Sequence, residues 1–172
     1  MSLSKAMEQL NTSIQINEIK YQKNDLKYSS SGYLDIKYFG NQLNKTNEIN
    51  LNTTITKEIE AFNIDLKLKF TYLNECSRCL NKKNKEDHAE FSKSFSLSTN
   101  NDYDIDFNDE SINLLPIVSE IIISKMELDN LCKKDCKGLC YMCGKDQNEY
   151  ICSHSEKNTK ESPFSSLSEL DL

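Results

Sequence analysis

The fold of this chain is decided by residues 62–72, whose sequence is FNIDLKLKFTY. Apolar side chains occupy every second position from Phe62 to Tyr72, and polar or charged side chains stand between them. This period of two predicts a long antiparallel strand with one face against a core and the other in water. The strand leads directly to Cys76 and Cys79, so a pair of cysteines is expected at its end.

The same alternation recurs on both sides of this strand. It predicts further strands over residues 14–19, 32–39, 49–59 and 89–97. Residues 81–85 are polar and predict a turn, so Cys76 and Cys79 should lie at the tip of a long hairpin. Residues 98–110 are acidic and rich in Asn, which predicts a solvated loop.

The period of the apolar residues changes after this loop. They now recur at every third or fourth position: Leu115, Val118, Ile121, Ile122 and Met126. This spacing predicts a helix that packs on the sheet. Pro116 fits the first helical turn, where a missing N–H group costs nothing, and Ser111 or Asn113 is expected to cap the helix.

These patterns predict an α+β fold. We expect a curved antiparallel sheet or partial barrel with one packing helix and a small zinc-bound C-terminal module. Residues 1–130 are predicted to form the sheet-plus-helix domain, and residues 131–172 the Cys-rich zinc module and C-terminal tail. A hydrophobic content of 37% allows one modest core, which a bound metal could reinforce.

Seven cysteines and one histidine have the spacing of metal ligands. The candidates are Cys76, Cys79, Cys132, Cys136, Cys140, Cys143, Cys152 and His154. A C-x-x-C loop turns two thiolates towards one ion, and structural zinc takes four such ligands in a tetrahedron. The spacing therefore predicts one or two zinc ions.

The spacing leaves the grouping of these ligands open. One grouping joins four residues that are close in sequence: Cys140, Cys143, Cys152 and His154. A second site would then combine distant segments: Cys76, Cys79, Cys132 and Cys136. The alternative is one site built from both C-x-x-C pairs: Cys76, Cys79, Cys140 and Cys143. A redox-active pair is also open, although no βαβ pattern surrounds either pair.

The charge of the chain limits its partners. The net charge is −6 and the isoelectric point is about 5.0, which argues against a general nucleic-acid coat and fits a basic partner such as a ribosomal protein. Four lysines beside the cysteines are candidate contacts to RNA phosphates: Lys82, Lys83, Lys134 and Lys137. The alternative is that they are ordinary solvated lysines, balanced by neighbouring acidic residues.

Other function classes lack their sequence signals. No apolar run approaches the roughly 18 residues of a membrane span, and Met1 leads into no signal segment, so we expect a cytoplasmic protein. In a reducing compartment, clustered thiols favour a metal over disulfides. No Gly-rich phosphate loop and no Ser/His/Asp order stands out. We therefore expect no enzyme activity and no small-molecule substrate.

Three motifs occur in a distinctive order along the chain. They are the Cys76-Ser77-Arg78-Cys79-Leu80 segment, the apolar segment 112–116 with Glu120, and the segment 136–144 (CKGLCYMCG) followed by Asn148. This set resembles the YceD family, whose members are called large ribosomal RNA subunit accumulation proteins. This chain departs from the family pattern at three places. Tyr141 stands where the family usually has Pro, and His154 stands where it usually has Cys. The closing Asp-Pro-Arg of many members is replaced by Glu-Ser-Pro-Phe at residues 161–164. A His in that place still ligates zinc.

The resemblance implies a non-catalytic ribosome biogenesis factor that supports accumulation of large-subunit ribosomal RNA. Its partner would be that RNA or a basic ribosomal protein. One alternative is a zinc-dependent interaction module that binds a basic ribosomal protein and never touches RNA. A second alternative is a thiol redox or metal-handling protein, which would have a labile metal and a reactive Cys76 or Cys79.

Overall fold

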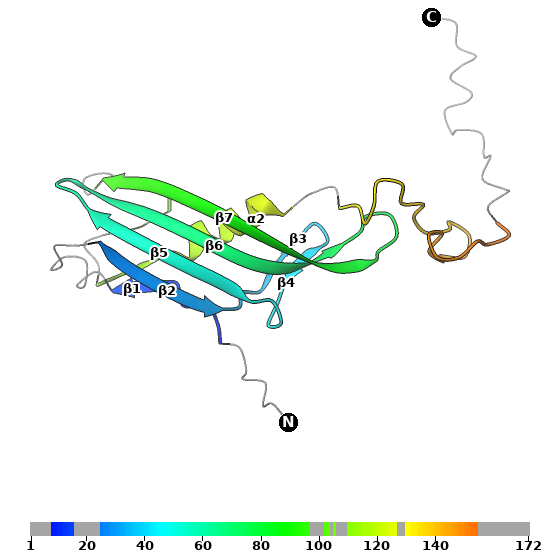
Figure 1. Cartoon of the computed structure of the whole chain (residues 1–172), viewed down its shortest axis with the longest axis horizontal. Helices are drawn as coiled ribbons and strands as arrows, with labels where there is room; N and C mark the ends of the chain where they lie inside the picture. The colour runs from blue at the N-terminus through cyan, green and yellow to red at the C-terminus, as the bar shows by residue number, and fades with distance from the viewer. Residues whose placement is uncertain are drawn as a thin grey trace, which may run out of the picture.

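The two longest strands of the sheet, β6 (Ala61–Glu75) and β7 (Lys82–Ser96), form a hairpin (Figure 1). The computed structural model describes residues 8–15, 25–96, 102–103, 105, 110–126 and 130–154. The hairpin strands pair along their whole length, from Ala61 opposite Ser96 to Glu75 opposite Lys82. Every second side chain of β6 is buried, which confirms the strand predicted from the alternation: Phe62, Ile64, Leu66, Leu68, Phe70 and Tyr72.

The other strands extend the sheet from the second edge of β6. Strand β5 (Ile49–Lys57) pairs with β6, and β2 (Leu26–Gly32) pairs with β5. Strand β4 (Asn41–Leu43) pairs with the last part of β6, and β3 (Ile36–Tyr38) pairs with β4. A separate two-stranded sheet joins β1 (Ser13–Gln15) to β8 (Ser111–Asn113).

All strand pairs between these elements are antiparallel, as predicted. The order is β2-β5-β6-β4-β3, with β7 on the other edge of β6. Within the described residues this pairing does not close on itself, so the sheet is open and does not form a barrel. The fold is thus a mostly antiparallel sheet with one helix and two groups of cysteines.

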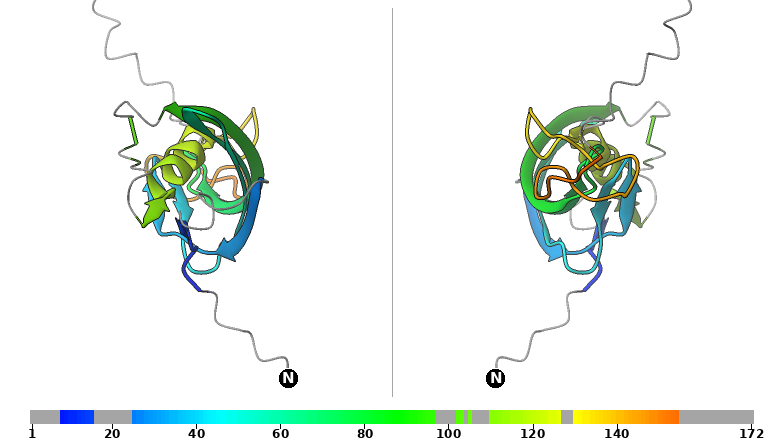
Figure 2. Two further views of the ribbon diagram at one scale, coloured as in Figure 1. Left: turned by 90° about the vertical axis from the view of Figure 1, so that its left-hand side faces the viewer. Right: turned by 90° about the vertical axis from the view of Figure 1, so that its right-hand side faces the viewer.

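Helix α2 (Leu115–Lys125) lies against one face of the sheet (Figure 2). Its buried residues, Ile117, Val118, Ile121 and Ile122, join the same core as the buried face of β6, which confirms the predicted helix. Pro116 stands in the first turn. Asn113 accepts a hydrogen bond from the Leu115 N–H group through Oδ1 at 2.9 Å, although the N-cap residue itself is Leu114.

Two predicted boundaries are wrong. The single strand expected over 32–39 is split, because β2 ends at Gly32 and β3 begins only at Ile36. Gly32 itself packs closely on the backbone of residues 8–10, where a Cβ would lie 2.6 Å from the Leu10 nitrogen. The turn expected over 81–85 is shorter, because β7 already begins at Lys82, opposite Glu75. The predicted strand positions 16–19, most of the acidic loop and residues 161–164 lie outside the described residues.

The two faces of β6 should respond very differently to truncation. Leu66 is 1% exposed in the core, and Lys67 lies on the outer face in an exposed ion pair with Glu90. We expect Leu66→Ala to lower the free energy of unfolding by about 2–5 kcal/mol. Lys67→Ala should change it by less than about 0.5 kcal/mol. Chemical denaturation of both variants tests this, and similar losses would contradict the assigned faces.

Candidate metal centre

The structure brings the eight candidate ligands together in two groups of four. The first group is Cys76, Cys79, Cys132 and Cys136, and the second is Cys140, Cys143, Cys152 and His154. Within each group the ligand atoms all lie within 4.8 Å of one another. Cys140 and Cys143 thus belong to a different group from Cys76 and Cys79, so the structure does not form the mixed site built from both C-x-x-C pairs.

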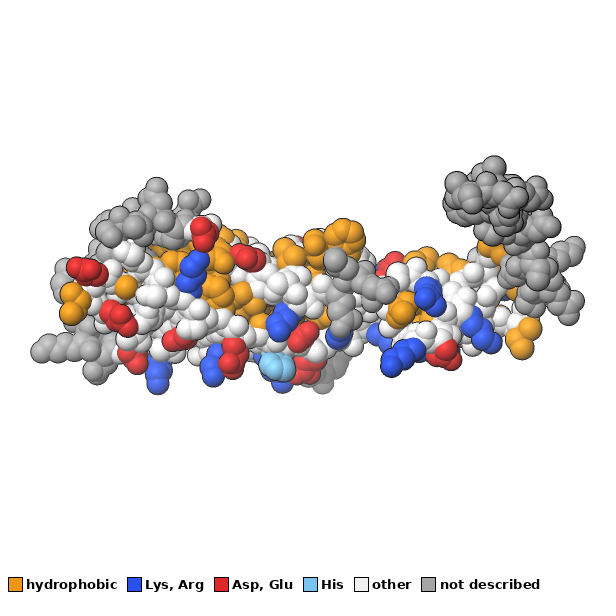
Figure 3. Space-filling view, turned by 90° about the horizontal axis from the view of Figure 1, so that it is seen from above, with side chains coloured by type: hydrophobic (Ala, Val, Ile, Leu, Met, Phe, Trp, Pro, Cys, Tyr) orange, Lys and Arg blue, Asp and Glu red, His pale blue; other side chains and the backbone are white. Residues whose placement is uncertain are grey.

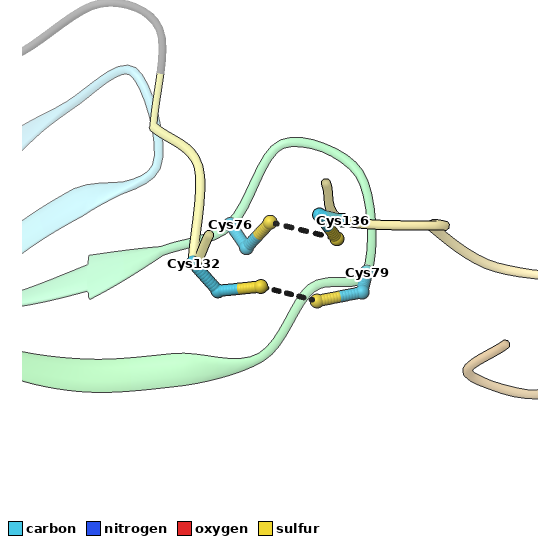
Figure 4. Close-up of side chains that lie close together, drawn as sticks. All are labelled: Cys76, Cys79, Cys132 and Cys136. Atoms are coloured by element: carbon cyan, nitrogen blue, oxygen red, sulfur yellow. Dashed lines mark hydrogen bonds between the residues drawn. The ribbon is translucent and has the colours of Figure 1, made fainter. Parts of the chain in front are cut away.

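The first group has the spacing of a tetrahedral sulfur site (Figure 4). The Cys76 and Cys136 Sγ atoms are 3.8 Å apart, and those of Cys79 and Cys132 are 3.6 Å apart. A tetrahedron with metal–sulfur bonds of about 2.3 Å has sulfur–sulfur edges of about 3.8 Å. All the cysteines are free thiols, and three members of this group are buried. These four sulfurs could therefore hold a metal ion.

The second group lies further along the Cys-rich segment that follows α2 (Figure 1). The Cys140 Sγ atom is 3.9 Å from Nδ1 of His154. Cys140 is buried, but Cys143 is exposed, and Cys152 and His154 are half-buried. This group could also hold a metal ion, and its ligands are more open to solvent than those of the first group.

The first C-x-x-C pair sits in a tight turn at the tip of the β6–β7 hairpin. The Cys76 N–H group donates to the Asn81 carbonyl at 2.9 Å, and the Leu80 N–H group donates to the Cys76 carbonyl at 2.9 Å. Leu80 has a φ of 58°, in the left-handed region that L-residues rarely adopt. The turn curls the backbone around Cys76, so that both sulfurs of the pair face the same point.

The second C-x-x-C pair repeats this turn. The Cys140 N–H group donates to the Lys145 carbonyl at 2.8 Å, and the Gly144 N–H group donates to the Cys140 carbonyl at 2.7 Å. Gly144 has a φ of 70°, so a glycine occupies the position that Leu80 occupies in the first turn. The same local geometry therefore prepares both pairs for a metal.

Hydrogen bonds from backbone N–H groups lower the pKa of thiols in both groups. Burial raises the pKa of Cys76, but hydrogen bonds from the backbone of Cys79, Cys132 and Arg78 outweigh burial and bring the pKa to about 6. Burial raises the pKa of Cys79 to about 12. The lowered pKa favours the thiolate form of Cys76, whereas the raised pKa of Cys79 favours its protonated form, whose proton metal binding would release.

The second group has a matching thiolate. Hydrogen bonds from the backbone of Cys143 and Met142 lower the pKa of Cys140 to about 6. The neighbouring Cys140 sulfur raises the pKa of Cys152. A cation placed among these sulfurs would compensate the charge of the Cys140 thiolate and favour deprotonation of the others.

Asn130 holds the distant ligand segment against the hairpin tip. Its side chain is buried, donates to the Phe39 carbonyl at 3.0 Å, and accepts a hydrogen bond from Nδ2 of Asn74 at 2.6 Å. Its backbone carbonyl accepts a hydrogen bond from the Ser77 N–H group at 2.7 Å. The chain that leads to Cys132 is therefore held beside the first cysteine pair by hydrogen bonds that involve no metal.

Arg78 fixes the second half of the same segment. Its carbonyl accepts a hydrogen bond from the Leu139 N–H group at 3.1 Å, and its guanidinium donates to the Cys136 carbonyl at 3.3 Å. Gly138 approaches so closely that a Cβ there would lie 3.1 Å from the Arg78 carbonyl oxygen. The sequence did not predict the roles of Asn130 and Arg78. No spacing pattern identifies a polar residue whose hydrogen bonds go to a segment far away in the sequence.

The four predicted RNA-contacting lysines are all exposed and lie near the first group. Lys82 and Lys83 begin β7 just after the hairpin tip, while Lys134 and Lys137 flank Cys136. Lys82 is paired with Glu75 at 3.0 Å. Figure 3 shows Lys and Arg side chains, with hydrophobic side chains among them, on the end of the molecule that carries the Cys-rich segment.

The fold and site together define a protein with an antiparallel sheet and two cysteine-rich groups that could each hold a metal ion. Residues 64–171 match the family model described as "Large ribosomal RNA subunit accumulation protein YceD", and the chain belongs to this YceD family. The match includes nearly all of β6, the whole of β7, helix α2 and both groups of ligands. No curated protein and no solved structure matches the chain significantly.

The family is described by ribosomal RNA accumulation and not by an enzymatic reaction. In the part of the chain that the structure describes, no helix has both the length and the apolar character needed to cross a membrane.

The contact between Gly138 and Arg78 can be tested against a matched glycine. Gly138 and Gly144 both have a positive φ, but a Cβ at residue 144 would meet nothing within 4 Å. Gly144→Ala should therefore cost only the left-handed strain, about 1–2 kcal/mol. Gly138→Ala should cost more, because it also displaces the Arg78 backbone. Thermal unfolding of the metal-loaded variants tests this order, and equal losses would contradict the close approach.

Proposed function

We propose that this protein is a non-catalytic ribosome biogenesis factor that supports accumulation of large-subunit ribosomal RNA and holds two structural zinc ions. The family match over residues 64–171 carries the biological part of this proposal. The two groups of four ligands support the metal part. We further propose that the protein acts in the cytoplasm, where a reducing environment keeps clustered thiols available for a metal.

The donor atoms support zinc over other ions. One group offers four sulfurs, and the other offers three sulfurs and one imidazole nitrogen. Such soft, four-coordinate sets are typical of structural zinc sites. Catalytic zinc sites usually keep one position open for water or substrate, whereas here the protein supplies all four ligands. The ligand sets therefore favour a structural metal over a catalytic one.

A zinc ion in the first group would join the two parts of the protein. We take residues 1–130 as the sheet-plus-helix domain and residues 131–172 as the zinc module with its tail. Cys76 and Cys79 come from the sheet hairpin, whereas Cys132 and Cys136 come from the module. The ion would thus fix the module at the hairpin tip, beside the exposed lysines.

We propose that direct RNA contact, where it occurs, uses the lysines beside the first group. Zinc bound by four thiolates carries a net charge of about −2, and zinc bound by three thiolates and a histidine about −1. Part of the positive charge of Lys82, Lys83, Lys134 and Lys137 therefore offsets the metal centres. The positive charge that remains on these lysines would attract phosphates only near the hairpin tip, because the chain as a whole has a net charge of −6.

The same net charge favours a second candidate partner. A protein with a net charge of −6 attracts basic proteins over a distance of about one Debye length. In this second proposal, the chain binds a basic ribosomal protein, and its effect on ribosomal RNA is indirect.

Metal analysis tests the structural part of the proposal. We expect about two zinc ions per chain, because each ion takes four ligands. Cys140→Ser should lose one ion and increase hydrogen exchange beyond residue 138, while β6 keeps its protection because it has its own core. A metal-free chain that folds cooperatively would contradict the proposal. Rapid metal exchange with a reactive Cys76 would instead support the thiol redox or metal-handling alternative.

Salt-dependent binding tests the RNA contact. Replacing Lys82, Lys83, Lys134 and Lys137 by Gln should flatten the slope of log affinity against log salt by roughly 3 units for single-stranded RNA, since each phosphate contact contributes about 0.7. The matched control replaces four exposed lysines of the sheet domain: Lys27, Lys45, Lys57 and Lys67. An unchanged slope in the first variant would exclude contact by these lysines. Capture of a basic ribosomal protein without RNA binding would favour the second candidate.

A further inference from the structure

The side chain of Asn148 bridges the two ligand groups. Its Nδ2 atom donates a hydrogen bond to Sγ of Cys136, a member of the first group, at 3.3 Å. Its Oδ1 atom accepts a hydrogen bond from the Lys137 N–H group at 3.0 Å. Asn148 itself lies in the loop between Cys143 and Cys152, two members of the second group. A residue in the loop between two ligands of the second group thus contacts a ligand of the first.

The loop around Asn148 is held by hydrogen bonds to residues 138 and 139 and by hydrogen bonds within the loop. The Gln147 N–H group donates to the Gly138 carbonyl at 2.9 Å, and Leu139 forms an antiparallel bridge with Asp146. The Asp146 carboxylate accepts hydrogen bonds from the backbone and side chain of Asn148, at 2.8 and 2.6 Å. A metal in the second group would close both ends of this loop and keep the Asn148 amide aimed at Cys136.

An N–H donor to a ligating sulfur has a defined chemical effect. It withdraws part of the negative charge that a four-thiolate centre concentrates on its sulfurs, and it fixes the direction of the sulfur lone pairs. Residues that hydrogen-bond to a metal ligand are important for metal binding. Their mutation typically changes metal affinity 10- to 100-fold. The Asn148 amide is placed to have this effect on the first centre.

We propose that Asn148 is a positioning residue through which the second metal centre controls how firmly the first centre holds its ion. This inference rests on the proposal that both groups hold zinc. Loss of the second ion opens the loop between Cys143 and Cys152, withdraws the amide from Cys136, and speeds release of the first ion. Because binding free energies are linked, loading of the first centre also strengthens the second.

The burial of the two groups gives this coupling a direction. Cys143 is exposed and two other members of the second group are half-buried, whereas three of the four sulfurs of the first group are buried. A chelator or oxidant therefore reaches the second centre first. Its loss would then be transmitted to the ion that attaches the module to the hairpin tip.

Metal release from the full chain tests the coupling. The protein is loaded with two equivalents of cobalt(II), whose visible absorption differs between a four-sulfur site and a site with three sulfurs and one nitrogen. Release into excess chelator is then followed separately for each centre. We expect Asn148→Ala to speed release from the four-sulfur centre by about tenfold. The neighbouring control, Gln147→Ala, keeps its backbone contact to Gly138 and should release cobalt at the wild-type rate.

Two further variants separate this role from a general loosening of the loop. Asn148→Asp keeps an oxygen acceptor for the Lys137 N–H group but turns a carboxylate oxygen towards Cys136, so release should be faster still. Cys152→Ser, which empties the second centre, should speed release from the first as much as Asn148→Ala does. Adding Asn148→Ala to Cys152→Ser should have no further effect, because the two changes remove the same interaction. His154→Ala, which removes the imidazole ligand of the second group, provides the same test.

Four results would overturn the proposal. They are a wild-type release rate in Asn148→Ala, equal acceleration by Gln147→Ala, additive effects in the double variant, and a wild-type chain that binds fewer than two ions. These rates are measured without RNA or a ribosomal protein. A failure of the coupling is therefore distinguishable from a failure of the proposed role in ribosome biogenesis.

Discussion

The convergence of four sulfurs at the tip of the β6–β7 hairpin is the constraint on which the rest of this structure depends. Strand β6 delivers Cys76 and Cys79, and the buried Asn130 fixes the chain that brings Cys132 and Cys136. The Sγ–Sγ distances of 3.6 and 3.8 Å leave room for one tetrahedrally bound ion. In our proposal, that ion completes the joint between the sheet and the Cys-rich segment.

The two parts of the protein are stabilised by different forces. The sheet and α2 share one continuous apolar core, which needs no metal. Around the first ligand group the buried cluster is small and consists mainly of the cysteines themselves, with Leu131 and Leu139 packed against it. Several large apolar side chains of the Cys-rich segment are exposed: Tyr141, Met142, Tyr150 and Ile151. For a segment this short with so little burial, the proposed metal ligation would supply stability that its own packing does not.

Sequence patterns correctly predicted the elements that have a periodic or local signal. They failed where contacts between distant segments determine the structure. The strict alternation along residues 62–72 predicted β6, and the spacing of three to four residues predicted α2. The start of β7 at Lys82 was missed because Lys, Asn and Glu have low β-propensity, and pairing with β6 overrides it. Likewise, the spacing of the cysteines indicated ligand pairs, but their grouping depends on Asn130 and Arg78, whose contacts span more than fifty residues.

The distribution of charge bears on where a partner would bind. On the outer face of the hairpin, Lys67 pairs with Glu90 and Lys69 with Glu86, so these lysines are neutralised by their cross-strand neighbours. Beside the cysteines, Lys82 pairs with Glu75. Under our proposal the lysines there also lie near zinc–thiolate centres, whose net charge would change on loss of the metal. Metal occupancy would therefore set both the shape and the charge of this end of the molecule. A partner that recognises it would distinguish the loaded protein from the empty one, which makes the coupling through Asn148 relevant to binding as well as to stability.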